Sequence, residues 1–125
     1  YIGLQSPLTQ STASPFLPYT SRPGIIFFPA RTTYGVSGGQ GPTQPSFLLT
    51  YAEVAFIQAE AAERGWIPGN ARSYYEAGIT ASMNQWGITD AAAIAAYLAQ
   101  PAVAYAGGTE GLRQIARQKW IALFT

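Results

Sequence analysis

The sequence predicts an all-α protein whose helices pair into antiparallel hairpins after an irregular leading segment. Nineteen of the 21 Ala and all six acidic residues lie within residues 47–125. Residues that commonly begin or end helices also recur along this part of the chain. Residues 1–46, by contrast, hold seven of the nine Pro and six of the thirteen Gly, so no helical period can run through them. We therefore expect tetratricopeptide-like helical hairpins preceded by a loop-rich segment with at most a short strand.

The leading segment is irregular in composition but not hydrophilic. It carries only two charges, and Pro-Gly and Gly-Gly pairs, which mark turns, recur along it. The apolar run Ile25–Phe28 predicts a short strand or an extended buried segment that ends at Pro29. We divide the chain into an irregular Pro/Gly-rich segment, residues 1–46, and a helical tetratricopeptide-like part, residues 47–125.

The first helix is predicted to begin near Thr50 and to run to Arg64. Thr50 suits the N-cap position, and Glu53 three residues later completes a capping-box pattern. Gly65 follows the last helical residue, a position at which glycine commonly ends a helix. Small side chains recur on one face, so that a neighbouring helix can approach closely: Ala52, Ala55, Ala59 and Ala62.

The second helix is predicted to start after a Pro-Gly pair, with Asn70 as its N-cap, and to end at Gly87. Gly78 lies in its interior, where glycine costs about 1 kcal/mol relative to alanine. A close crossing with the first helix would explain this glycine. The residues expected to face inward are Tyr75, Ile79, Met83 and Trp86.

Two further helices complete the predicted hairpins. The third is short, has Thr89 or Asp90 as its cap, and ends before Pro101. The fourth runs from about Thr109 to residue 123. The residues expected to face inward are Ile94, Tyr97 and Leu98 on the third helix and Leu112, Ala116, Trp120 and Leu123 on the fourth.

The composition excludes most enzymatic chemistry. Because His and Cys are both absent, the chain has no Ser-His-Asp triad, no thiolate nucleophile and no imidazole or thiolate metal ligand. Only six carboxylates remain, so we expect no enzymatic activity, no cofactor and no metal. The net charge of +1 is too small for nucleic-acid binding through phosphate neutralisation. No segment approaches the ~18 consecutive apolar residues of a membrane-spanning helix.

Two groups of charged residues each allow a functional and a structural interpretation. Glu53 and Glu60 share a helix face and could act as an acid/base pair. Helix capping by Glu53 and an ion pair between Glu60 and Arg64 account for them better. The basic stretch 113–119 could bind phosphate, but a solvated or ion-paired helix face is the simpler interpretation.

Aromatic residues in loops are the candidates for ligand contact. Trp66 follows the end of the first helix, and Tyr19 and Tyr34 lie in the irregular segment. Loops carry function more often than the elements they connect, so these three residues are our ligand-binding candidates. Trp86 and Trp120 occur at helical spacing and are expected in the core instead.

Four motifs in the helical part resemble one family. They are residues 49–65 (LTYAEVAFIQAEAAERG), 74–87 (YYEAGITASMNQWG), 97–101 (YLAQP) and 115–124 (IARQKWIALF). In this order and at this spacing they are similar to the SusD/RagB family, especially its SusD-like branch with Thr-Tyr-Ala-Glu. The paired-Arg segment that usually follows in that family is missing.

The resemblance implies a nutrient-binding lipoprotein on the surface of the bacterial outer membrane. Such a protein captures oligosaccharides, or sometimes peptides, and delivers them to a SusC-like TonB-dependent transporter in polysaccharide utilisation. It implies no catalytic residue, and a lipid anchor that would lie outside this chain. Family members are much longer, and the chain begins without Met, so we expect an internal fragment of a larger SusD-like domain.

Two other functional classes stay open at this point. One is a helical-repeat scaffold that mediates protein–protein interaction without any role in sugar binding. The other is a carboxylate glycosidase, which would depend on residues beyond this chain.

Overall fold

The computed structural model describes residues 9–13, 15 and 47–123. Contacts divide the chain into two compact units, residues 1–44 and 45–125. The described part of the first unit includes α1 (Gln10–Ala13), a single helical turn. The predicted strand at Ile25–Phe28 lies outside the described residues.

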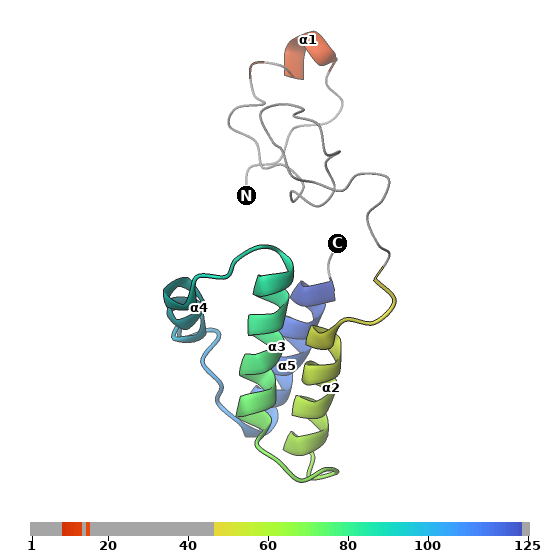
Figure 1. Ribbon diagram of the computed structural model, residues 1–125, viewed down its shortest axis with the longest axis vertical. Coiled ribbons are helices and arrows are strands. Elements are labelled where there is room, and N and C mark those ends of the chain that lie inside the picture. The colour runs from red at the N-terminus through yellow and green to blue at the C-terminus, as the bar shows by residue number, and fades with distance from the viewer. Residues whose placement is uncertain (1–8, 14, 16–46, 124–125) are drawn as a thin grey trace. The chain divides into compact units, whose positions relative to one another are not determined.

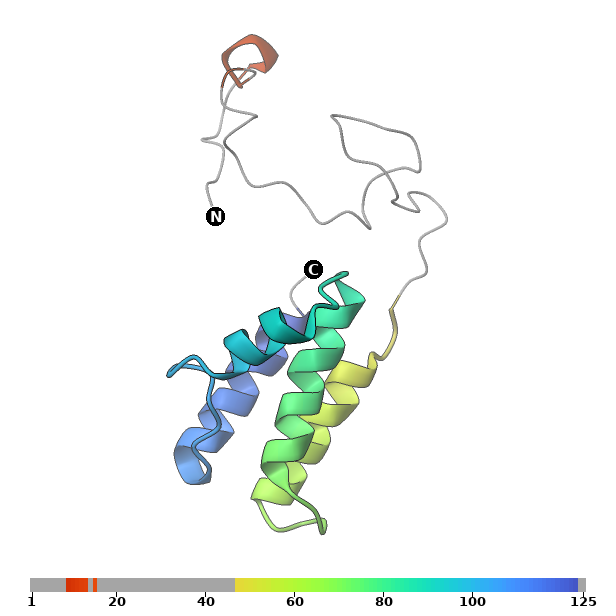
Figure 2. The ribbon, with the colours of Figure 1, turned by 60° about the vertical axis from the view of Figure 1, so that its left-hand side comes forward.

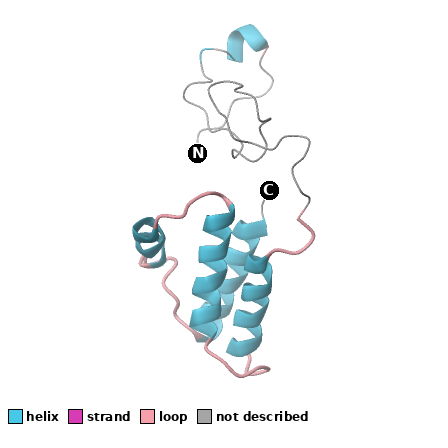
Figure 3. Ribbon diagram, in the orientation of Figure 1, coloured by secondary structure: helices cyan, strands magenta, loops and turns pink. Residues whose placement is uncertain are grey.

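The second unit has four helices among its described residues. They are α2 (Tyr51–Glu63), α3 (Ala71–Gln85), α4 (Ala91–Leu98) and α5 (Gly108–Leu123). Every regular element in the described part of the chain is a helix, as Figure 3 shows, and the predicted all-α class is confirmed.

The helices α2, α3 and α5 lie side by side. In Figure 1 and Figure 2, α3 returns antiparallel to α2, and α5 runs antiparallel to α2. The first predicted hairpin is therefore confirmed as α2–α3. The second is less regular, because α5 packs mainly on α2 whereas α4 packs on α3. We refer to residues 99–107, between α4 and α5, as the connection.

The predicted N-caps hold the starts of three helices. The side-chain oxygen of Thr50 accepts the N–H of Glu53 at 3.2 Å, and that of Asn70 accepts the N–H of Ser73 at 3.3 Å. For α4 the structure selects Asp90, whose Oδ1 accepts the N–H of residue 92 at 3.0 Å. Each bond satisfies one of the backbone donors that the first turn of a helix leaves without a partner.

The core lies where α2, α3 and α5 meet. Its largest fully buried side chains are Phe56, Tyr75 and Ile115. A Cβ on Gly78 would come within 2.9 Å of the ring of Phe56, so the glycine inside α3 makes room for this ring. The predicted close crossing of the two helices is thus confirmed. The small residues of α2 line the core as predicted, except that one is only half-buried: Ala52, Ala55 and Ala59 are buried, and Ala62 is not.

The predicted inner face of α5 is wrong. Trp120 is 65% exposed, and Ala116 and Leu123 are exposed as well. The buried residues of α5 are Gly111, Gln114, Ile115, Gln118 and Ala122. Two of the five are glutamines and one is a glycine, so the hydropathy of the sequence does not identify the face of α5 that packs against the other helices.

Two inward positions predicted on α3 are also less buried than expected. Met83 and Trp86 near its C-terminal end are half-buried, whereas Tyr75 and Ile79 in its middle are fully buried. The core therefore centres on the middle of α3, where α2 and α5 both reach it.

Candidate functional site

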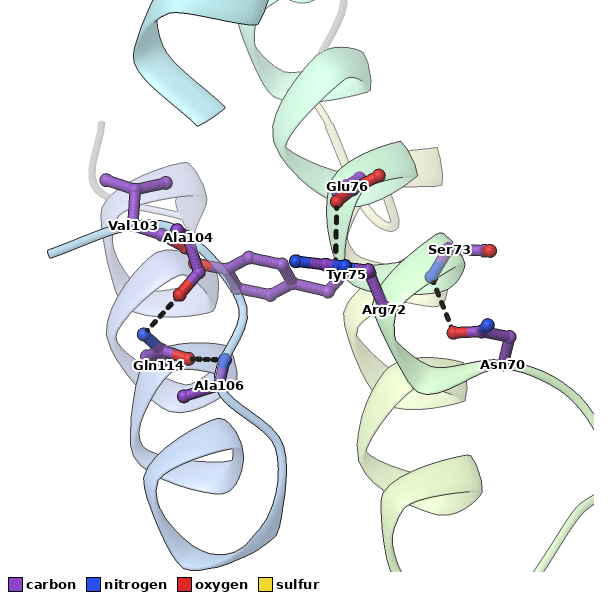
Figure 4. Close-up of polar contacts among 9 residues, drawn as sticks. All are labelled: Asn70, Arg72, Ser73, Tyr75, Glu76, Val103, Ala104, Ala106 and Gln114. Atoms are coloured by element: carbon purple, nitrogen blue, oxygen red, sulfur yellow. Dashed lines mark hydrogen bonds and ion pairs between the residues drawn. The ribbon is translucent and has the colours of Figure 1, made fainter. Parts of the chain in front are cut away.

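Polar side chains from α3 and α5 hold the connection in place, as Figure 4 shows. The hydroxyl of Tyr75 donates a hydrogen bond to the carbonyl of Val103 at 2.7 Å. The side-chain amide of Gln114 donates to the carbonyl of Ala104 and accepts the N–H of Ala106, both at 2.9 Å. These three bonds give partners to two backbone carbonyls and one backbone N–H of the connection and tie it to α3 and α5.

A carboxylate at the end of α2 also holds this segment. Glu63 accepts one hydrogen bond from the hydroxyl of Tyr105 and another from the backbone N–H of Gly108. A Cβ on Gly111 would lie 3.0 Å from the Tyr105 hydroxyl oxygen, so this glycine leaves space for the tyrosine. The Tyr105 ring packs on that of Tyr75 with 5.1 Å between centroids.

Both tyrosines are held in their neutral form. Burial raises the pKa of Tyr75 to about 12, and the negative charge that Tyr97 and Glu76 would present adds to this. Burial and the hydrogen bond to Glu63 also raise the pKa of Tyr105. Neutral hydroxyls that already donate to fixed acceptors stabilise structure and are unsuited to general-base chemistry at neutral pH.

One member of the acidic pair considered from the sequence, Glu60, has a structural role. Glu60 forms a 2.8 Å ion pair with Arg64 one turn later, as predicted. Glu53 takes part in the cap of α2 through its backbone N–H, which donates to the side chain of Thr50. The predicted interpretation of Arg113 as an ion-paired residue is also confirmed, since its guanidinium lies 3.3 Å from Glu110.

The described residues contain no group of three or more acidic side chains able to hold a metal ion. Among the same residues, no helix is both long and apolar enough to span a bilayer.

Trp66 is the sequence-predicted ligand candidate that the structure places. It lies in the loop between α2 and α3 and is 71% exposed. The guanidinium of Arg64 sits over its ring, 5.2 Å from the centroid, and Glu60 holds this guanidinium in turn. Tyr19 and Tyr34 lie outside the described residues, so their roles stay predictions.

The polar cluster around the connection was not anticipated from the sequence. Glu63, Gln114 and Tyr105 act over 8 to 45 residues of sequence separation, and no local motif links such distant positions. The one available signal was the pair Gly107-Gly108 directly before a predicted helix, where a capping residue is normally found.

The family model described as SusD-like, starch-binding and associating with the outer membrane matches residues 10–125. The match covers the four motifs and much of the irregular segment before them. No curated protein is significantly similar to the chain.

Solved structures agree with this match. The chain is similar to a SusD-like protein of Bacteroidetes AC2a, with 42% identity and a TM-score of 0.58 over 62% of this chain. It is also similar to a SusD homologue of Parabacteroides distasonis, with 37% identity and a TM-score of 0.50 over 58% of this chain. The aligned part spans 16% of each of these proteins.

Proposed function

The chain belongs to the SusD-like family of starch-binding proteins that associate with the outer membrane, and on that basis we propose that it is part of a glycan-capture protein at the bacterial cell surface. The observation that carries the proposal is the family match over residues 10–125. The composition supports it, because the chain lacks the His and Cys on which most catalytic sites depend. We propose a binding protein and no enzyme.

We further propose that the captured glycan passes to a SusC-like TonB-dependent transporter, which would be the membrane partner of the full protein. Helices α2, α3 and α5 would act as a rigid scaffold in this complex. Their large buried side chains and fully partnered buried polar groups, among the described residues, support a rigid role.

Binding by the full-length protein tests the first part of this proposal. Isothermal titration against a panel of oligosaccharides, with starch fragments first and peptides as a second group, should reveal at least one ligand. Co-purification from outer membranes should recover a TonB-dependent transporter. No binding across the panel together with no transporter would overturn the proposal.

At the level of residues, we propose Trp66 as a glycan contact. The guanidinium of Arg64 lies over one face of its ring and restricts the motion of the ring before any ligand arrives. A rigid, exposed aromatic ring contributes contact area at low entropic cost. The flat apolar face of a pyranose ring would suit the ring face that Arg64 leaves open.

Substitution of Trp66 tests whether this residue contacts the glycan or belongs only to the scaffold. Trp66→Ala in the full-length protein should weaken glycan binding by about tenfold, the loss typical of an important contact residue. Trp120→Ala is the matched control, because Trp120 is similarly exposed but lies on α5. Equal affinities of Trp66→Ala and the unchanged protein would rule out this contact.

An interaction scaffold without a sugar role is the second candidate function. The observation that favours it is the exposure of Trp120, Ile121 and Leu123 together near the end of α5, since tryptophan is enriched at the centres of protein interfaces. A pull-down with the full-length protein that recovers a soluble partner and no transporter would support this function over glycan capture.

A further inference from the structure

The start of α5 has no capping side chain of its own. Gly107 and Gly108 both adopt left-handed backbone conformations, with φ of 74° and 60°. Residues with side chains rarely adopt this conformation, and the Ser, Thr, Asp or Asn that normally caps a helix does so from an extended backbone. The two glycines therefore allow a sharp turn into α5, but they have no side chain that could cap the helix.

A residue of another helix supplies the missing acceptor. Glu63, on the last turn of α2, accepts the N–H of Gly108, the first residue of α5. A carboxylate at this place also interacts favourably with the positive end of the α5 dipole. Glu63 thus fills the role of an N-cap from 45 residues away.

The same carboxylate also holds the connection that leads into α5. Its second hydrogen bond, from Tyr105, fixes the ring that packs against Tyr75. The bonds from Tyr75 and Gln114 reach the neighbouring backbone groups but do not reach the first turn of α5. Among the described residues, Glu63 is the side chain that ties both the connection and the helix start to α2.

We propose that Glu63 is a tertiary cap that works as a latch, closing the connection and the first turn of α5 onto α2. With the latch released, this segment opens locally while the α2–α3 hairpin stays folded, because the Phe56 and Gly78 contact does not involve Glu63. The inference is independent of the proposed glycan binding.

Amide hydrogen exchange of the full chain tests the latch. Glu63→Gln keeps the size of the side chain but removes its charge and one of its two acceptor oxygens. Exchange of residues 103–110 should become about tenfold faster or more, as expected for losing a hydrogen bond to a charged group. Exchange of residues 52–60 and 74–82 in α2 and α3 should stay within about twofold of the unchanged protein.

Matched variants separate the latch from general destabilisation. Glu60→Gln removes the same charge one turn earlier on α2, where the partner is Arg64, and should leave residues 103–110 protected. Tyr105→Phe removes one of the two donors and should accelerate exchange in the same segment by a smaller factor; it also tests the latch if Glu63→Gln fails to fold. Unchanged protection of residues 103–110 in both variants, or an even acceleration across α2, α3 and α5, would overturn the proposal.

Discussion

The α2–α3 hairpin and the α5 segment are held by different kinds of contact. The hairpin is joined by small and aromatic side chains, with Phe56 fitted against Gly78. The α5 segment and its connection depend strongly on polar groups, namely the buried Gln114 and Tyr75 and the half-buried Glu63. Apolar packing is non-directional and roughly proportional to area, whereas a buried polar group needs a specific partner. The first kind of contact leaves a periodic trace in the sequence, and the second does not.

The largest effect is expected in the hairpin. Phe56→Ala should lower the free energy of unfolding by about 3–5 kcal/mol, because it removes a fully buried ring and leaves a cavity beside Gly78. Urea denaturation followed by circular dichroism measures this loss. A loss below about 1 kcal/mol would show that the hairpin is not the centre of the core.

A smaller effect of unexpected sign is predicted in the α5 segment. Gln114→Leu replaces a polar residue that is only 7% exposed with an apolar one of similar size. Hydropathy alone would predict stabilisation. We expect a destabilisation of about 1–3 kcal/mol instead, because the carbonyl of Ala104 and the N–H of Ala106 lose their partner.

Gln100→Leu provides the control for this variant. Gln100 lies in the connection but is exposed, so its substitution should change the free energy of unfolding by no more than about 0.5 kcal/mol. If urea denaturation showed that Gln114→Leu stabilises the protein, this would contradict the claim that polar contacts hold the α5 segment and its connection.

The smallest effect is expected at Trp120. From the sequence this residue belonged to the core, where its loss would cost on the order of 3–5 kcal/mol. Since its side chain is 65% exposed, we now expect Trp120→Ala to change the free energy of unfolding of the chain by about 0.5 kcal/mol or less. Thermal melting of the two proteins side by side is sufficient to distinguish these values.

Much of the hairpin was predictable because its signals are local. The N-caps Thr50 and Asn70, the left-handed glycines Gly65 and Gly87, and the Glu60–Arg64 ion pair each involve residues within four positions of one another. The role of Gly78 could also be predicted, because a glycine inside a helix lowers its stability and close packing of a second helix explains why it is there.

The prediction of the buried face of α5 was wrong, and the reason is also physical. A helix buries the side that its neighbours cover, and its most apolar side need not be that side. On α5 the neighbours cover Gly111, Gln114 and Gln118, and leave Trp120 outside. The glutamines tolerate burial because the connection and Tyr97 provide their hydrogen-bond partners, which lie 8 to 21 residues away.

The sequence by itself determined the all-α class, the approximate positions at which α2 to α5 begin and end, the close α2–α3 crossing and the family, but not the short α1. Each of these follows from residue types within a few positions, or from motifs read in order. Only the tertiary structure decided which face of α5 is buried, how Glu63 caps that helix from α2, and that Trp66 stands exposed on an arginine. These features depend on partners brought together by the fold, and a hydrogen bond between residues 45 positions apart leaves no mark in the local pattern of either one.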